Sequence, residues 1–209
     1  TDGRGLQAQA VQDYWRQQCY GLTPAQFDAV DRVWPHVDAL HADLRKLLDA
    51  DLPALAQPAT LAQCLQAQAQ QEQTLRAGWP PRVQALRDWL EVQLQQHKAH
   101  WDGRKIQAGR CTTWLDALQQ WLDGDLWQPL DWPEAAWRRL TPQGLREARL
   151  ASAPPLDLPE ASAALEHLQQ ALQATAPLAA QLRLHAATQV QQRVALLKRQ
   201  GRVLGFHDL

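Results

Sequence analysis

Apolar residues recur at steps of three and four along most of the chain, which is the period of an amphipathic α-helix. The clearest stripe lies between Pro177 and Gln200, and its members are Leu178, Leu182, Ala186, Val190, Val194 and Leu197. Pro177 suits the first turn of a helix, and Gly201 suits a C-terminal stop. The pattern therefore predicts a long helix that ends at Gly201.

The same period predicts further helices upstream, separated by glycine and proline. The expected spans are 6–20, 24–34, 37–50, 60–76, 83–101, 113–122, 135–149 and 160–174. Thr23, Thr60 and Thr113 stand where N-caps are expected, because a threonine oxygen accepts a hydrogen bond from the first helical turn. The span 83–101 has a spacing close to that of a coiled-coil seam, so we expect it to be long and paired with its neighbour.

Composition favours helices over strands. Ala, Leu and Gln dominate the 209 residues, whereas isoleucine occurs once, at Ile106, and phenylalanine twice. Strands favour the β-branched and aromatic residues that are scarce here. We predict an all-α fold, a multi-helix bundle with a long antiparallel helical arm. An apolar run of 18 residues is absent from the sequence, so we expect no membrane span.

The cysteines and the charges set further limits. Cys19, Cys64 and Cys111 are dispersed, which favours reduced thiols and a cytoplasmic protein over a disulfide framework. With 21 basic and 22 acidic residues, global charge does not indicate a nucleic-acid partner. Any contact with phosphates must come from a local patch.

One local patch stands out. Arg104, Lys105 and Arg110 lie in a loop-like stretch, and Lys98 precedes them by about one turn. A positive cluster at the tip of a helical hairpin can neutralise phosphates without reading sequence. We name these four residues as candidate DNA contacts. The other interpretation is an ordinary solvated tip.

Other candidate sites are weaker. His97, His100 and Asp102 could bind a metal, but their spacing is more typical of ordinary surface histidines, and a fourth ligand is not evident. Asp123 and Asp125 are more typical of a turn than of paired catalytic carboxylates. A nucleophile motif and a glycine-rich phosphate loop are both absent from the sequence, so we predict no catalytic, metal or cofactor site within this chain.

The ten tryptophans are predicted to be mainly core residues, because most lie beside leucine on helix faces. Trp79 and Trp101 fall at predicted helix ends. We expect these two to be the most exposed.

Four sequence blocks resemble a known family. They are DYWRQQCYGL at 13–22, WDGRKI at 101–106, WLDALQQW at 114–121 and KRQGRVLGFHDL at 198–209. Together they resemble the RecB family, the beta subunits of exodeoxyribonuclease V, which are UvrD-like superfamily 1 DNA helicases. The resemblance spans nearly the whole chain. Its first and last blocks are the more specific ones, whereas the Gln- and Ala-rich middle is not specific.

The resemblance implies a domain organisation. Residues 1–200 would be the helical 1B insertion of the first motor domain, and 201–209 the start of the return into that RecA-like domain. Phe206 to Leu209 corresponds to the family's Phe-Asp-Asp-Leu-type motif, with His207 where an aspartate is usual. We expect the polypeptide to continue beyond Leu209, and residues 205–209 to be poorly ordered here because the sheet they would join is absent.

The resemblance also implies a function. The parent enzyme would use ATP and magnesium to unwind duplex DNA, would carry a nuclease domain further on, and would work with RecC-like and RecD-like subunits in double-strand break repair and recombination. The chain itself would be an arm that contacts the duplex ahead of the fork. One alternative is a structural module that packs against another subunit through tryptophan-rich faces, with no DNA contact. Another is an independent helical adaptor unrelated to helicases.

Overall fold

The computed structural model describes residues 3–52 and 59–207, with side chains described as far as residue 201. This part of the chain is all-α, as predicted, and its β-type pairing consists of one isolated antiparallel bridge between Trp101 and Arg149. The chain divides into two compact units: unit 1 comprises residues 1–69 and 176–209, and unit 2 comprises residues 70–175. No described helix combines the length and the apolar character that a membrane span requires.

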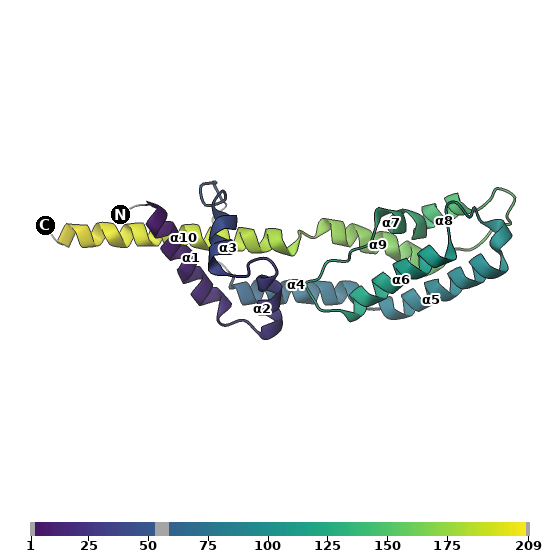
Figure 1. Cartoon of the computed structure of the whole chain (residues 1–209), viewed down its shortest axis with the longest axis horizontal. Coiled ribbons are helices and arrows are strands. Elements are labelled where there is room, and N and C mark those ends of the chain that lie inside the picture. Colours follow the sequence, from purple (N-terminus) through teal and green to yellow (C-terminus); the bar gives the residue numbers. More distant parts are fainter. Residues whose placement is uncertain (1–2, 53–58, 208–209) are drawn as a thin grey trace. The chain divides into compact units, whose positions relative to one another are not determined.

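Unit 1 is built around its last helix (Figure 1). Its helices are α1 (Gly3–Tyr14), continued by a π-helical turn at Trp15–Cys19, α2 (Pro24–Asp31), α3 (Val37–Leu44), the first part of α4 (Leu61–Arg76) and α10 (Leu178–His207). Helices α1 and α3 pack on α10. The core contains Trp34, which is fully buried, with Val11 from α1, Leu40 from α3 and Leu182 from α10.

Polar contacts tie α10 to the rest of unit 1. The Arg193 guanidinium binds the Asp13 carboxylate at 2.8 Å, and Arg183 binds Asp43 at 2.7 Å. The Asp43 carboxylate also accepts a hydrogen bond from the Trp34 indole at 2.8 Å. Such links fix the register of α10 against α1 and α3 more than they stabilise the unit, because partly exposed ion pairs contribute little.

A buried histidine joins three segments of unit 1. His185 on α10 lies 2.9 Å from the Tyr14 hydroxyl through Nδ1 and 2.7 Å from the Ala59 carbonyl oxygen through Nε2. A carbonyl only accepts, so Nε2 carries the proton and Nδ1 accepts from tyrosine. Burial lowers the pKa of His185, although the bond to Ala59 acts in the opposite direction. Burial also raises the pKa of Tyr14 well above its ordinary value. The neutral pair is therefore the stable form.

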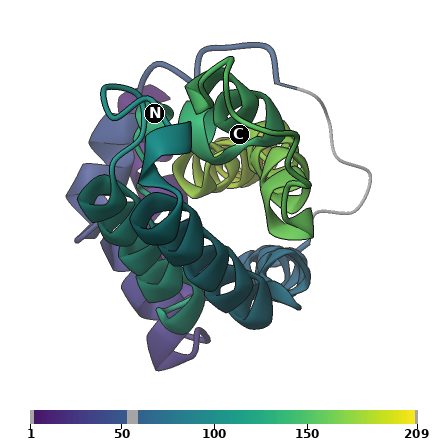
Figure 2. The same ribbon diagram turned by 90° about the vertical axis from the view of Figure 1, so that its right-hand side faces the viewer.

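Unit 2 is a helical bundle with its own core. It contains the last part of α4, α5 (Trp79–Glu91), continued by a π-helical turn at Val92–Gln96, α6 (Ala108–Asp123), α7 (Glu134–Leu140), α8 (Pro142–Ala148) and α9 (Glu160–Ala174). Helices α5 and α6 lie side by side (Figures 1 and 2). Leu86, Leu115, Leu118, Leu140 and Leu165 fill the space between α5, α6, α7 and α9.

Two predicted N-caps are confirmed and one is wrong. Thr23 and Gln26 form a reciprocal capping box, and the side chains of Thr60 and Gln63 bond each other's backbone N–H groups in the same way. Thr113, by contrast, lies inside α6, where its hydroxyl donates to the Gly109 carbonyl at 3.0 Å. Helix α6 begins five residues earlier than predicted, at Ala108.

The predicted exposure of Trp79 and Trp101 is also wrong, since they are only 3% and 5% exposed. Trp79 belongs to the first turn of α5 and joins the core of unit 2. Trp101 follows the helical segment, which ends sooner than predicted, and packs edge-on against Trp89 with ring centroids 5.9 Å apart. A position at a helix end thus does not expose a tryptophan when a neighbouring segment covers it.

The predicted stop at Gly201 is not observed. Helix α10 continues through Gly201 to His207. Glycine weakens a helix interior by only about 1 kcal/mol relative to alanine, so strong helix formers on its N-terminal side can carry the helix past it. The predictions for the Phe206 side chain and for Asp208 and Leu209 lie outside the described residues.

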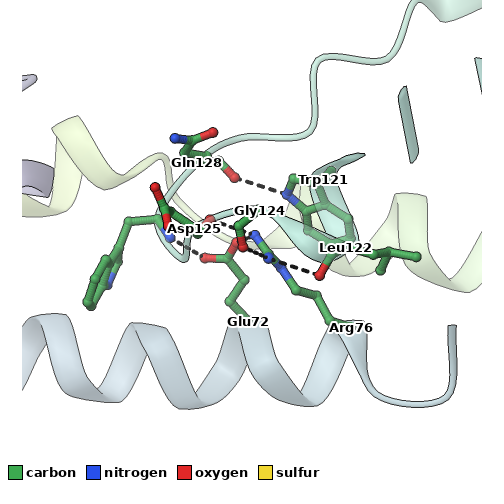
Figure 3. A network of polar contacts seen from close by, with 8 residues as sticks. Glu72, Arg76, Trp121, Leu122, Gly124, Asp125 and Gln128 are labelled. Atoms are coloured by element: carbon green, nitrogen blue, oxygen red, sulfur yellow. Dashed lines mark hydrogen bonds and ion pairs between the residues drawn. The ribbon is translucent and has the colours of Figure 1, made fainter. Parts of the chain in front are cut away.

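Unit 2 also contains a network of polar contacts that closes the end of α6 (Figure 3). Arg76 on α4 donates to the carbonyl oxygens of Gly124 at 2.7 Å and Asp125 at 3.0 Å, and to the Glu72 carboxylate at 2.5 Å. The Arg76 guanidinium also lies over the ring of Trp121, 4.6 Å from its centroid. Carbonyls at the end of a helix have no partner within the helix. Arg76 supplies donors for carbonyls of the loop that follows α6.

Glu72 completes this network on the other side of the loop. Its second carboxylate oxygen accepts the backbone N–H of Trp127 at 2.8 Å. Trp127 has a φ of +67°, which places its backbone in the left-handed region that a tryptophan rarely adopts. The carboxylate therefore helps to hold a turn that local propensity does not favour.

Candidate nucleic-acid interface

The four predicted DNA contacts lie on one stretch of unit 2. Lys98 belongs to a short 3₁₀ turn, Arg104 and Lys105 lie in the loop that follows, and Arg110 lies in the first turn of α6. All four side chains are exposed. The structure thus leaves the predicted residues accessible at the junction between the α5 segment and α6.

Local hydrogen bonds give this loop a defined shape. The Asp102 carboxylate accepts the backbone N–H of Arg104 at 2.9 Å, and the Asp102 carbonyl accepts those of Lys105 and Ile106 at 2.9 Å and 3.1 Å. The Ile106 side chain is 3% exposed and anchors the loop in the core. The basic side chains therefore extend from a turn that is held at its base.

The C-terminal end of α8 is docked against this loop. The Asp102 N–H donates to the Ala148 carbonyl at 2.8 Å, and the Leu150 N–H donates to the His100 carbonyl at 3.0 Å. The Lys105 ammonium reaches the Glu147 carbonyl at 2.9 Å. These three bonds join segments that are more than 40 residues apart in the sequence.

The docked segment adds two basic residues that the sequence pattern did not indicate. Arg146 is exposed on α8, and the Arg149 guanidinium stacks over the Trp101 ring, 5.1 Å from its centroid. Arg149 also donates to the Pro154 carbonyl. The proximity of this segment to the loop depends on tertiary docking, and no local pattern in the sequence reveals it. We define the basic end of unit 2 as Lys98, Arg104, Lys105, Arg110, Arg146 and Arg149.

The basic end carries an excess of positive charge. Within the described part of the chain, Lys98, Arg104, Arg110 and Arg146 make no ion pair, whereas Arg82 and Arg87 elsewhere in unit 2 pair with carboxylates. The acidic residues closest in sequence to these six are Asp102, which is occupied with the loop backbone, and Glu147.

Helix α6 begins in the same loop, and among the described residues no side chain caps its first turn. The positive end of its dipole therefore adds to the field of the basic side chains. Accessible guanidinium and ammonium groups of this kind hold phosphates by charge and hydrogen bonding, without base-specific contacts.

The other predicted positions have different surroundings. The rings of His97 and His100 stack almost parallel, and in the described residues no group of three or more potential ligands is placed to bind a metal ion. Asp123 ends α6, and Asp125 contributes its carbonyl oxygen to the Arg76 network. Both aspartates therefore lie in a helix-ending turn.

A hollow of about 350 Å³ lies in unit 1 between α1 and α10. Its lining includes Tyr14, Gln17, Gln192, Arg193 and Leu196. The Arg193 charge is already neutralised by Asp13, so this hollow offers no charge complementarity comparable to that of the basic end.

All ten tryptophans lie within the described residues, and each of them is buried or half-buried. Six of them are buried, and Trp15, Trp89, Trp114 and Trp127 are half-buried. The tryptophan-rich faces that one alternative assigns to a partner subunit are therefore largely unavailable.

No protein-family model matches the chain, and no curated protein matches its sequence.

Proposed function

We propose that unit 2 holds duplex DNA through its phosphate backbone, by means of the basic end. The observation that supports this most directly is the accessibility of Lys98, Arg104, Arg110 and Arg146, which have no ion-pair partner in the described part of the chain. Phosphate contacts supply most of the sequence-independent affinity of DNA-binding proteins. A loop anchored at its base suits such contacts because less side-chain and backbone freedom is lost on binding.

From the basic end and the sequence resemblance, we propose that the chain is the helical arm of a RecB-like ATP-dependent helicase and exonuclease. Such an enzyme acts in double-strand break repair and recombination. The ATP and magnesium sites of such an enzyme would lie in motor domains outside this chain. RecC-like and RecD-like subunits would be its protein partners, and its compartment would be the cytoplasm. An all-α domain that presents basic side chains at one end supports this assignment.

The test is binding of a short labelled duplex, followed by fluorescence anisotropy at about 50 mM and about 200 mM salt. The key variant replaces Arg104, Lys105 and Arg110 with alanine. It should weaken binding by roughly tenfold to a hundredfold and reduce the salt slope by about 1 for each phosphate contact removed.

A matched control changes the total charge equally at another place. Arg32, Arg45 and Lys46 are exposed in unit 1, and the triple alanine variant at these positions also removes three positive charges. We expect that control to keep most of the affinity. Equal losses in both variants would show that binding follows net charge, and the assignment to the basic end would be wrong.

The partner-subunit alternative is supported by a different observation. Unit 1 exposes large apolar side chains, among them Tyr20, which is 77% exposed, and also Phe27, Leu184 and Leu196. If these residues form the functional surface, the chain should bind a partner protein with little salt dependence. Replacement of Tyr20 and Leu184 by serine would then abolish that binding, whereas the triple variant of the basic end would not.

A further inference from the structure

Two histidines lie beside the basic end. His97 is exposed and His100 is half-buried, and they flank Lys98 in the turn that leads into the loop. Their ring centroids are 5.6 Å apart and their planes differ by only 6°. The hydrogen bond from Leu150 to the His100 carbonyl fixes this turn, so the rings are held together by backbone geometry as well as by stacking.

The charged groups near this pair, in sequence or on the docked α8 segment, are of both signs. Lys98 lies between the two rings in sequence, and Arg149 is on the docked α8 segment. The π-helical turn before the pair contains no charged residue. The nearby carboxylates are Glu91, which accepts a hydrogen bond from Gln95 at 3.4 Å, Asp102, which is occupied with the loop backbone, and Glu147.

Histidine is the side chain whose charge ordinarily changes between about pH 5 and pH 8. Two imidazolium rings at this separation would repel each other. An anion placed at the basic end would offset that repulsion by attracting both rings. Because protonation and anion binding each favour the other, they must be coupled in both directions.

We propose that the stacked pair His97 and His100 makes phosphate binding at the basic end proton-linked, so that the arm holds DNA more tightly in mildly acidic than in mildly alkaline solution. Each bound phosphate next to the pair draws protons onto the two rings, which then act as further cationic contacts. This inference rests on the proposed function, because it assigns a regulation to the same DNA site.

The experiment measures duplex binding by the whole chain between about pH 6 and pH 8 at constant ionic strength, with far-UV circular dichroism at each pH to confirm folding. Each imidazolium should add roughly two- to fivefold to the affinity, which is typical of an exposed ion pair. The wild-type affinity should therefore rise by roughly four- to twenty-fivefold from the alkaline to the acidic end of the range.

The variant His97→Gln with His100→Gln should show nearly the same affinity at every pH. His167 is an exposed histidine on α9, also in unit 2, and His167→Gln should leave the pH dependence unchanged. Binding that is present but independent of pH in the wild-type chain would overturn this inference while leaving the proposed function intact. A pH dependence that survives in the double variant would likewise overturn it. The absence of duplex binding at every pH would refute the proposed function, and this inference with it.

Discussion

The Arg76 network offers the sharpest test of how unit 2 is held together. In Arg76→Ala, the Gly124 and Asp125 carbonyl oxygens in the loop after α6 lose their donor, and the Glu72 carboxylate loses its counter-ion. The Arg76 and Glu72 side chains are only 10% and 12% exposed, so water screens the pair much less than it screens a surface ion pair. The ring of Trp121 also loses its cation.

The expected cost follows from these losses. Removing one partner of a fully buried ion pair costs about 3–5 kcal/mol, and an exposed pair contributes about 0–1 kcal/mol. The Arg76–Glu72 pair is closer to the fully buried case. Once Arg76 is removed, however, water can hydrate the carbonyl oxygens of the exposed loop. We therefore expect Arg76→Ala to lower the free energy of unfolding by about 2–4 kcal/mol, including about 1 kcal/mol from the lost cation–π contact.

Equilibrium urea unfolding, followed by tryptophan fluorescence and by circular dichroism, measures this loss. Arg76→Lys keeps the charge but not the fork of donors, so it should lose about half as much stability as alanine. Arg87→Ala is the matched control, because Arg87 pairs with Asp116 in the same unit but is more exposed. It should cost less than about 1 kcal/mol. The reasoning is refuted if Arg76→Ala destabilises the protein no more than Arg87→Ala does.

Three further predictions concern single positions. Gly144→Ala should destabilise unit 2 by about 3 kcal/mol or more in urea, because its Cβ would lie 1.9 Å from the Arg138 carbonyl oxygen; an unchanged midpoint would contradict that packing. Thr23→Ala should cost about 1 kcal/mol through loss of the capping box, whereas Thr23→Ser should cost much less. Folding lowers the pKa of His185 from its ordinary 6.5. Between the folded and the unfolded pKa the unfolded chain binds more protons, so stability should rise with pH there. Above that window stability should be level, and His185→Gln should remove the slope; a slope that persists would assign it to another group.

Local sequence signals predicted the helices well wherever the stabilising contacts are local. The Thr23 and Gln26 box lies within one helical turn, and the stripe from Leu182 to Val190 is buried as the helical period requires. Gly201 was predicted to end α10 from its residue type alone. A glycine ends a helix when the chain adopts the left-handed conformation there, and the sequence does not reveal whether it does so.

Features that depend on tertiary contacts could not be predicted in this way. Glu72 and Arg76 have the spacing of an ordinary surface pair on a helix, and only the docking of the loop after α6 makes them a buried network. Arg146 and Arg104 are far apart in the sequence, and backbone hydrogen bonds across the fold bring their segments together. No local basic cluster in the sequence therefore contains both residues. The four residues predicted as DNA contacts could be grouped from the sequence because they are neighbours in it.

The hydrogen bond between Gln71 and Thr175 has a consequence for how unit 2 could be used. It joins a residue near the start of the unit to its last residue at 3.2 Å, although the two are 104 positions apart in the sequence. A segment whose two ends meet can be transplanted into a loop of an unrelated host with short connections, much as inserted domains are tolerated elsewhere. Unit 2 could then be grafted as a cassette, and its own properties measured away from the rest of the chain.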